Sequence, residues 1–142
     1  MERLIRLGRV SAIDYEKGMM QVTYPDLDDA VTRYLPYMSF NDEYKMPEIG
    51  EDVYVLHLPS GQAGGVVIGP AWNKAAPPAQ GGAGLYRKEV GTTNGEAFVR
   101  YQSPTYEIDA SDIKFVSAAG TITVAEIISH IQHCESCPYF NG

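Results

Sequence analysis

Cysteine is nearly absent from this sequence, because the 142 residues include only Cys134 and Cys137, both close to the end of the chain. A disulfide framework is therefore excluded for the body of the protein, which needs a packed core. Basic residues are also scarce, with 11 Lys and Arg against 18 Asp and Glu and a formal net charge of -7. This balance repels phosphate backbones, so non-specific binding of nucleic acid is not expected.

Long apolar runs are missing as well. No stretch approaches the roughly 20 apolar residues that a helix needs to cross a bilayer. The opening residues, MERLIRLGRV, lack the sustained apolar region of a secretion signal. We therefore expect a protein that is made and folded in the cytoplasm.

Signals of catalysis are equally sparse. His57 lies in an apolar run without a serine or cysteine motif beside it, which is typical of a packed strand histidine. The run GGAGLYRK lacks the spacing and the following helix of a phosphate-binding loop. Adjacent acids such as Asp28 and Asp29 are typical of a solvated loop. The sequence therefore predicts a protein that is not an enzyme.

Tyrosine, glycine and proline are abundant, with 10, 14 and 9 residues, and favour a mostly β fold. Within the first half of the chain, alternation in DVYVLHL directs Val53, Val55, and Leu58 or its neighbours, toward a core. Because short strands leave exposed edges, residues 1–74 are expected to form a small closed barrel. Its five strands are predicted at 4–14, 19–24, 31–37, 52–58 and 64–69.

A Gly/Pro-rich linker is predicted at 75–84 and a β-stranded shaft at 85–122. Short alternating runs are predicted at 97–101, 106–110, 113–117 and 120–124. Their centres step by nine, seven and seven residues, which favours rung-like stacking over hairpins. Each run has too few inward side chains for a sheet core of its own, so three copies wound about one axis are expected to cover one another. The alternative is a further sheet packed on the barrel.

Residues 123–142 are predicted to form a short helix and a tip. Thr123-Val-Ala-Glu126 has the form of a capping box, and apolar side chains follow at helical spacing. Isoleucine at the heptad positions Ile127 and Ile131 favours bundles of three or more helices. The expected core of a trimer consists of Ile108, Phe115, Ile122, Ile127 and Ile131.

Three segments of the first half of the chain occur in an order typical of a known family. They are LGRVSAIDYEKGMMQVTYPD, then LPYMSF, then PEIGEDVYVLHLPSGQAGGVVIGPAWN. Within the last segment, Gly50 to Val53 and Gly65 to Gly69 fit the patterns Gly-Glu-x-Val and Gly-x-Val-x-Gly, with the turn glycine Gly61 between them. The chain resembles the phage baseplate assembly protein V and central spike family of contractile tails, related to type VI secretion and R-type bacteriocin spikes.

The resemblance implies an N-terminal OB-fold barrel and an intertwined trimeric β-shaft, of β-helix or prism type, that ends in a short helix. It implies a homotrimer that is synthesised in the bacterial cytoplasm, is assembled into the baseplate of a phage-like tail, and pierces the target envelope mechanically. The implied partners are copies of the chain itself, tail-tube or hub and baseplate wedge proteins, and a separate tip protein. The enzymatic insertions of larger members have no counterpart between Trp72 and Leu85.

An alternative function is that of an OB-fold module that binds single-stranded nucleic acid or carbohydrate. Stacking aromatic side chains are the usual platform of such modules, and Tyr24, Tyr34, Tyr37 and Phe40 are the candidates. The acidity of the same region, where Arg33 and Lys45 are the main basic residues among several acids, argues against this alternative.

The tip carries candidate metal ligands. His130, His133, Cys134 and Cys137 fall within eight residues, and imidazole with thiolate suits Zn²⁺ or iron. In a trimer each ligand would occur three times around the axis. Family members often bind an axial iron through a His-x-His pair that is not present here. The alternative is that Cys134 is an apolar core residue, Cys137 is a free or reversibly oxidised thiol and both histidines are solvated.

Metal analysis of protein purified without a His tag separates these alternatives. The metal hypothesis predicts a stoichiometric transition metal per trimer that is lost in Cys134→Ser and in His130→Ala. Metal-free protein under reducing conditions would contradict it. The remaining role of the helix would then be to close the end of the shaft.

Overall fold

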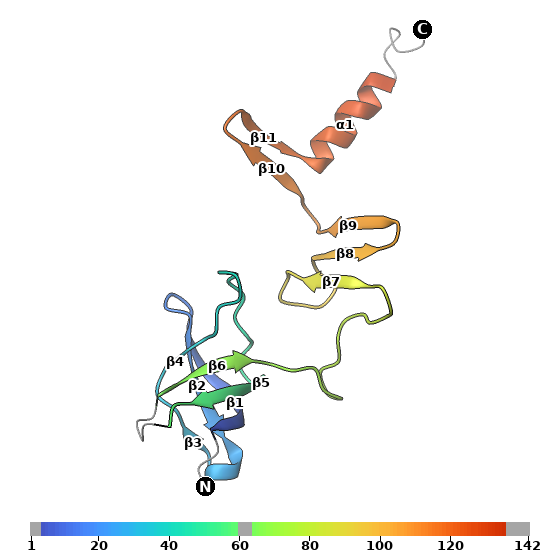
Figure 1. Cartoon of the computed structure of the whole chain (residues 1–142). Helices are drawn as coiled ribbons and strands as arrows, with labels where there is room; N and C mark the ends of the chain where they lie inside the picture. The colour runs from blue at the N-terminus through green and yellow to red at the C-terminus, as the bar shows by residue number, and fades with distance from the viewer. Residues whose placement is uncertain (1–3, 60–63, 136–142) are drawn as a thin grey trace. The chain divides into compact units, whose positions relative to one another are not determined.

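The computed structural model describes residues 4–59 and 64–135 of the chain. The described part is mostly β, with one α-helix at its C-terminal end (Figure 1). It divides into two compact units, Met1–Pro77 and Pro78–Gly142, and the division falls inside the predicted linker. None of the described helices is long and apolar enough to cross a membrane.

The first unit is built from one antiparallel sheet. Its strands are β1 (Ile5–Asp14), β2 (Met19–Tyr24), β3 (Ala30–Val31), β4 (Leu35–Pro36), β5 (Asp52–His57) and β6 (Gly65–Gly69). The order is β3-β2-β1-β5-β6, and a short 3-10 turn, η1 (Pro25–Leu27), follows β2. β1 and β2 form the hairpin that the turn residues predict, and Gly18 supplies the positive φ of 62° that this turn requires.

Hydrogen bonds continue from β6 back to β2, so the sheet closes on itself. β4 pairs with β2 through Leu35 and Met20. The chain then reaches β6, where Tyr37 forms a parallel bridge with Val67 and the Met38 amide donates to the Val67 carbonyl at 2.8 Å. Closure pairs the strand edges that an open sheet would expose, and this pairing stabilises a sheet made of short strands.

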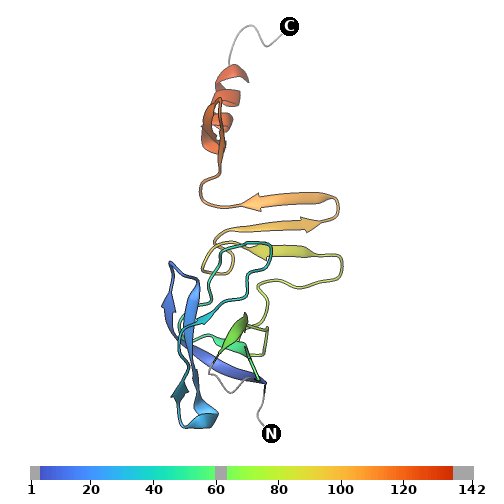
Figure 2. The ribbon, with the colours of Figure 1, turned by 60° about the vertical axis from the view of Figure 1, so that its left-hand side comes forward.

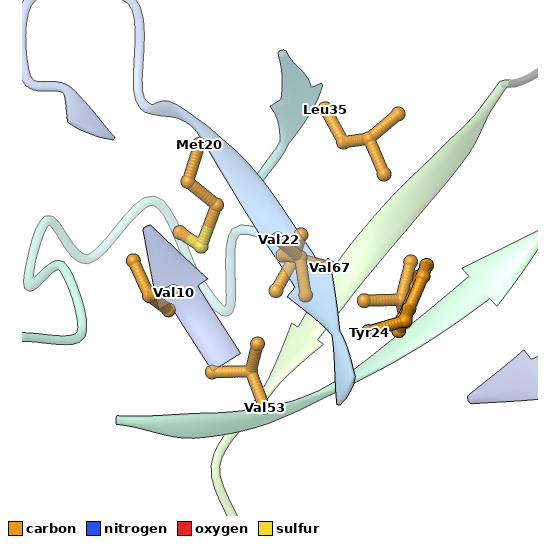
Figure 3. Close-up of a cluster of buried hydrophobic side chains, with 8 residues drawn as sticks. Val10, Met20, Val22, Tyr24, Leu35, Val53 and Val67 are labelled. Carbon is orange, nitrogen blue, oxygen red and sulfur yellow. The ribbon is translucent and has the colours of Figure 1, made fainter. Parts of the chain in front are cut away.

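The core of the first unit lies inside this closed sheet (Figure 3). Alternation on β5 directs Val53 and Val55 inward, and both are fully buried, as predicted. The third predicted position, Leu58 or its neighbours, is not part of the buried core: β5 ends at His57, the Leu58 side chain is 57% exposed, and Leu56 and His57 are half-buried. The buried side chains are Val10, Met20, Val22, Tyr24, Leu35, Val53, Val55 and Val67.

The second unit contains two separate antiparallel sheets and the helix (Figure 2). β7 (Tyr86–Glu89), β8 (Phe98–Gln102) and β9 (Thr105–Asp109) form a meander, and β10 (Lys114–Ser117) and β11 (Gly120–Thr123) form a hairpin. The spacing argument against hairpins is therefore wrong. Two-residue connections, at 103–104 and 118–119, let strands of four or five residues pair antiparallel at steps of nine and seven residues, with Val99 opposite Ile108 and Phe115 opposite Ile122.

The helix α1 (Val124–Glu135) begins with the predicted capping box. The Thr123 amide donates to Glu126 Oε2 at 2.7 Å, and the Glu126 amide donates to Thr123 Oγ1 at 3.2 Å. These bonds lower the pKa of the Glu126 carboxyl. The start of the helix is thus determined by its local sequence, whereas its apolar stripe has to be covered by packing.

Truncating a core side chain of the closed sheet tests this architecture. Met20→Ala should lower the free energy of unfolding by about 3 kcal/mol, because it removes buried atoms and leaves a cavity. Val31→Ala, at a 55% exposed position on β3, is the control and should change stability by less than about 0.5 kcal/mol. Urea denaturation followed by circular dichroism measures both, and equal effects would contradict the assigned core.

Candidate functional site

The second unit has almost no core of its own. Among its described residues, Phe98 is the one buried hydrophobic side chain, whereas the first unit buries eight. Large apolar side chains lie instead on its surface, on all three of its substructures. The most exposed are Tyr86, Val90, Tyr101, Tyr106, Ile108, Phe115, Val116, Ile122, Ile128 and Ile131. Such a surface indicates an interaction site.

One face of the β7-β8-β9 sheet is covered by the chain's own charged side chains. The Arg87 guanidinium stacks on the Phe98 ring, with 3.6 Å between its Cζ atom and the ring centroid. Arg100 lies over the same ring, and its Nε donates to Glu107 Oε2 at 3.0 Å. Arginine stems and guanidinium faces thereby remove Phe98 from water while the charges stay paired.

The linker contributes to this covering. Gln80 Oε1 accepts hydrogen bonds from both Arg87 Nη1 and Arg100 Nη1, each at 3.1 Å. Arg87 is also paired with Glu89, its Nε lying 2.5 Å from Glu89 Oε1. The apolar ring on this face is therefore covered by side chains of the same chain, and the paired charges above it are compatible with contact with water.

The opposite face of the same sheet is mostly apolar and open. Tyr86, Tyr101 and Tyr106 stand opposite one another in a row across the three strands. Lys88, Val99 and Ile108 form the next row on the same face. Tyr86 is 56% exposed and Tyr106 is 63% exposed, so the described part of the chain does not cover this row. One face of the sheet is thus covered by side chains of the same chain, and the other is exposed.

The hairpin and the helix also expose apolar side chains. Phe115 and Ile122 are cross-strand partners on one face of the hairpin, and Val116, which is 69% exposed, lies on the other. Residues of both faces line a shallow, open hollow. On α1, Ile131 is exposed and Ile127 is half-buried. The five residues predicted for a trimer core therefore lie on the surface of the second unit, Ile127 in part, where a further copy could cover them. Burial between copies stays a prediction.

The predicted metal ligands are only partly within the described residues. His130 and Cys134 are one helical turn apart on α1, and Cys134 is a half-buried free thiol. Cys137 lies outside the described residues. In the described part of a single chain, no group of three His, Cys, Asp or Glu side chains is close enough to hold a metal. Binding by ligands from several copies stays a prediction.

The four aromatic side chains considered as a stacking platform for nucleic acid or sugar are not all exposed on the surface. Tyr24 belongs to the buried core and is 4% exposed, and Tyr37 packs against that core. Tyr34 and Phe40 are exposed, at 43% and 55%. Half of the candidate aromatic side chains therefore serve packing.

His57 is held by a contact that the sequence does not predict. Its Nε2 atom lies 2.6 Å from the Tyr24 hydroxyl, and the two rings meet edge to face at 5.7 Å between centroids. Arg6 lies 5.8 Å from the Tyr24 ring centroid and 3.6 Å from the Asp26 carboxylate. Burial raises the pKa of Tyr24 to about 12, and the positive charge of Arg6 opposes the rise. His57 is therefore a packed histidine with a phenol partner.

Comparison with protein-family models and with curated proteins finds no match for this chain.

Alkaline unfolding tests the burial of the Tyr24 hydroxyl. A phenol whose pKa is raised by folding stabilises the protein fully below about pH 10, and this contribution is lost as the pH rises through about 12. Urea midpoints of the wild type should therefore fall between these pH values, and the fall should be smaller in Tyr24→Phe. Tyr15→Phe, at a 55% exposed position, should keep the wild-type profile. Identical profiles for all three proteins would contradict the assignment.

Proposed function

We propose that this chain is a structural, non-enzymatic protein, the homotrimeric central spike or hub of the baseplate in a contractile phage-like tail or bacteriocin. The proposal rests on the second unit, whose apolar faces are not covered by the described part of the chain. Its sheet, hairpin and helix each expose an apolar face, and a single buried side chain among its described residues gives no independent core.

Copies of the same chain are the partners that fit this pattern best. A partner has to cover a meander, a hairpin and a helix that follow one another in sequence, and another copy presents the same series with the same spacing. Three copies would place the tyrosine row, Ile108, and the Phe115–Ile122 pair around a common axis, as a β-prism or β-helix shaft. The Arg87–Phe98–Arg100 face would remain in water, where its ion pairs need no further partner.

The helix supports three copies over two. Ile127 and Ile131 take the heptad core positions, and isoleucine at both favours bundles of three or more helices. A helix of 12 residues is marginal alone, so it would be stabilised by its two counterparts and by the shaft. The tip histidines and cysteines would then meet near the axis, where zinc or iron is the candidate metal.

The strand connectivity of the first unit supports an OB-fold barrel. β1 pairs with β2 and β5, β5 pairs with β6, and the segment after β4 meets β6 in parallel through Tyr37 and Val67. A closed barrel of this strand order is the module that the family resemblance implies for the collar, where tail-tube or hub and baseplate wedge proteins would bind.

The role that follows is mechanical. Chains that are wound around one axis form a narrow rod whose strands are tied across copies, so the rod resists bending when the tail drives it against a target envelope. The charge of -7 and the buried Tyr24 argue against the alternative of a nucleic-acid module.

Two neighbouring residues on opposite faces of the hairpin provide the test. Light scattering should give three times the mass of the 142-residue chain for the wild type. Phe115→Asp should dissociate or strongly destabilise the trimer, because it puts three unpaired carboxylates into an apolar core at a cost of several kcal/mol each. Lys114→Asp, at an exposed position on the other face, should leave mass and melting temperature unchanged.

A monomeric or dimeric wild type would overturn the trimer. A Phe115→Asp variant with wild-type mass and melting temperature would show that this face of the hairpin does not contact another copy.

A further inference from the structure

The connection between β7 and β8 carries an asparagine at its tip. The amides of Val90 and Gly91 both donate to the Ala97 carbonyl, at 2.9 and 3.2 Å, and close the two ends of the connection. Asn94 lies between these ends, in a turn, and is exposed. We call residues 90–97 the Asn94 loop. Its ends are fixed by hydrogen bonds, whereas its tip is open to water.

The side chain of Asn94 differs from that of Asn73, an exposed asparagine of the linker. Asn73 Oδ1 accepts hydrogen bonds from the Ala75 and Ala76 amides, which hold its side chain in place. The Asn94 side chain forms no hydrogen bond with the part of the chain that the structure describes. Its amide carbon, Cγ, can therefore turn toward the next backbone nitrogen without the loss of a contact.

The residue after Asn94 leaves room for this approach. Gly95 adopts a positive φ of 84°, and nothing lies within 4 Å of the place that a β-carbon would take. Any residue other than glycine would carry a side chain there, next to the nitrogen. When Cγ of an asparagine joins the following nitrogen, a five-membered succinimide ring closes. Gly95 removes the steric obstacle to that ring.

A carboxylate is held at the proton of the same nitrogen. The Gly95 amide donates to Glu89 Oε2 at 2.9 Å, and Arg87 Nε lies 2.5 Å from Glu89 Oε1. Both oxygens of Glu89 are thus engaged, and its side chain is only 16% exposed. A general base takes a proton across heavy-atom distances of about 2.6–3.2 Å. The Gly95 nitrogen has to lose its proton to attack, because a neutral amide is a poor nucleophile.

We propose that Asn94 is a site of self-modification, converted to aspartate and isoaspartate with Glu89 as the general base. Glu89 takes the proton of the Gly95 nitrogen, which forms a bond to Asn94 Cγ. The bond between Cγ and Nδ2 breaks, and Nδ2 leaves as ammonia with the proton that Glu89 returns. Water then opens the succinimide at either carbonyl. One opening gives aspartate, and the other gives isoaspartate.

The product changes the loop in two ways. Either opening adds one negative charge to a chain whose formal charge is already -7, close to Glu89. Isoaspartate also adds a methylene group to the backbone between the loop ends that the Ala97 carbonyl closes. We therefore expect the pairing of β7 with β8 to weaken as the protein ages. This inference concerns one chain and does not depend on the proposed trimer.

Peptide mass spectrometry of the full chain, incubated at neutral pH, tests the proposal. Residue 94 should be converted at least as fast as in a synthetic peptide of residues 90–97, which lacks Glu89. Glu89→Gln keeps an acceptor oxygen for the Gly95 amide but removes the base. It should slow conversion at least about tenfold, since a general base contributes about 10²–10⁴.

Glu96→Gln is the matched control. Glu96 Oε2 accepts from the Thr93 amide at 3.2 Å and belongs to the same loop, so its replacement should keep the wild-type rate. Asn73 should stay unmodified in every variant. Circular dichroism verifies that the variants fold. If Glu89→Gln did not fold, Glu89→Asp, whose shorter side chain withdraws the carboxylate, would give the same comparison.

Urea separates the role of the fold from that of the sequence. In urea that unfolds the chain, wild type and Glu89→Gln should react at equal rates, because Glu89 is no longer held at Gly95. A folded chain that keeps Asn94 intact while the peptide reacts would overturn the modification site. Equal rates for folded wild type and folded Glu89→Gln, or a difference that persists in urea, would overturn the role of Glu89.

Discussion

The structure depends on one constraint: a β-sheet that carries apolar side chains on a face has to cover that face. The barrel meets the constraint by closing its sheet around eight buried side chains. The second unit meets it on one side only, where Arg87 and Arg100 lie over Phe98. The difference between the two units is therefore a difference in how much of the covering one chain supplies. In the proposed assembly, other copies of the chain cover the apolar faces that one chain leaves exposed.

The same constraint explains the division of polar and apolar surface in the second unit. Ion pairs are placed on the covered face, where they hold arginine stems against an aromatic ring, and tyrosines are placed on the open face. Tyrosine suits a surface that is exposed before assembly and buried afterwards, because its ring is largely apolar while its hydroxyl can hydrogen-bond in either state. A row of three such residues keeps the single chain compatible with water.

Much of the barrel could be predicted from the sequence, because its signals are local. Alternation located Val53 and Val55, and turn residues located the β1–β2 hairpin. The capping box at Thr123 could also be predicted from the local sequence. β7 was missed because YRKE is mostly charged and becomes a strand only through pairing with β8. The contact between Tyr24 and His57 joins residues 33 apart and depends on barrel closure, which no local pattern encodes. The predicted metal site stays a prediction because its ligands would come from separate chains.

The Gly/Pro-rich linker is stiffer than its composition suggests. On one side Asn73 Oδ1 accepts hydrogen bonds from the amides of Ala75 and Ala76, which fixes a tight turn. On the other side Gln80 is tied to two arginines of the following sheet. Between these contacts lie Pro77, Pro78 and Ala79, and proline fixes φ at the first two. Local hydrogen bonds and proline rings therefore remove backbone freedom at several positions of a segment whose glycine content would otherwise leave it open to many conformations.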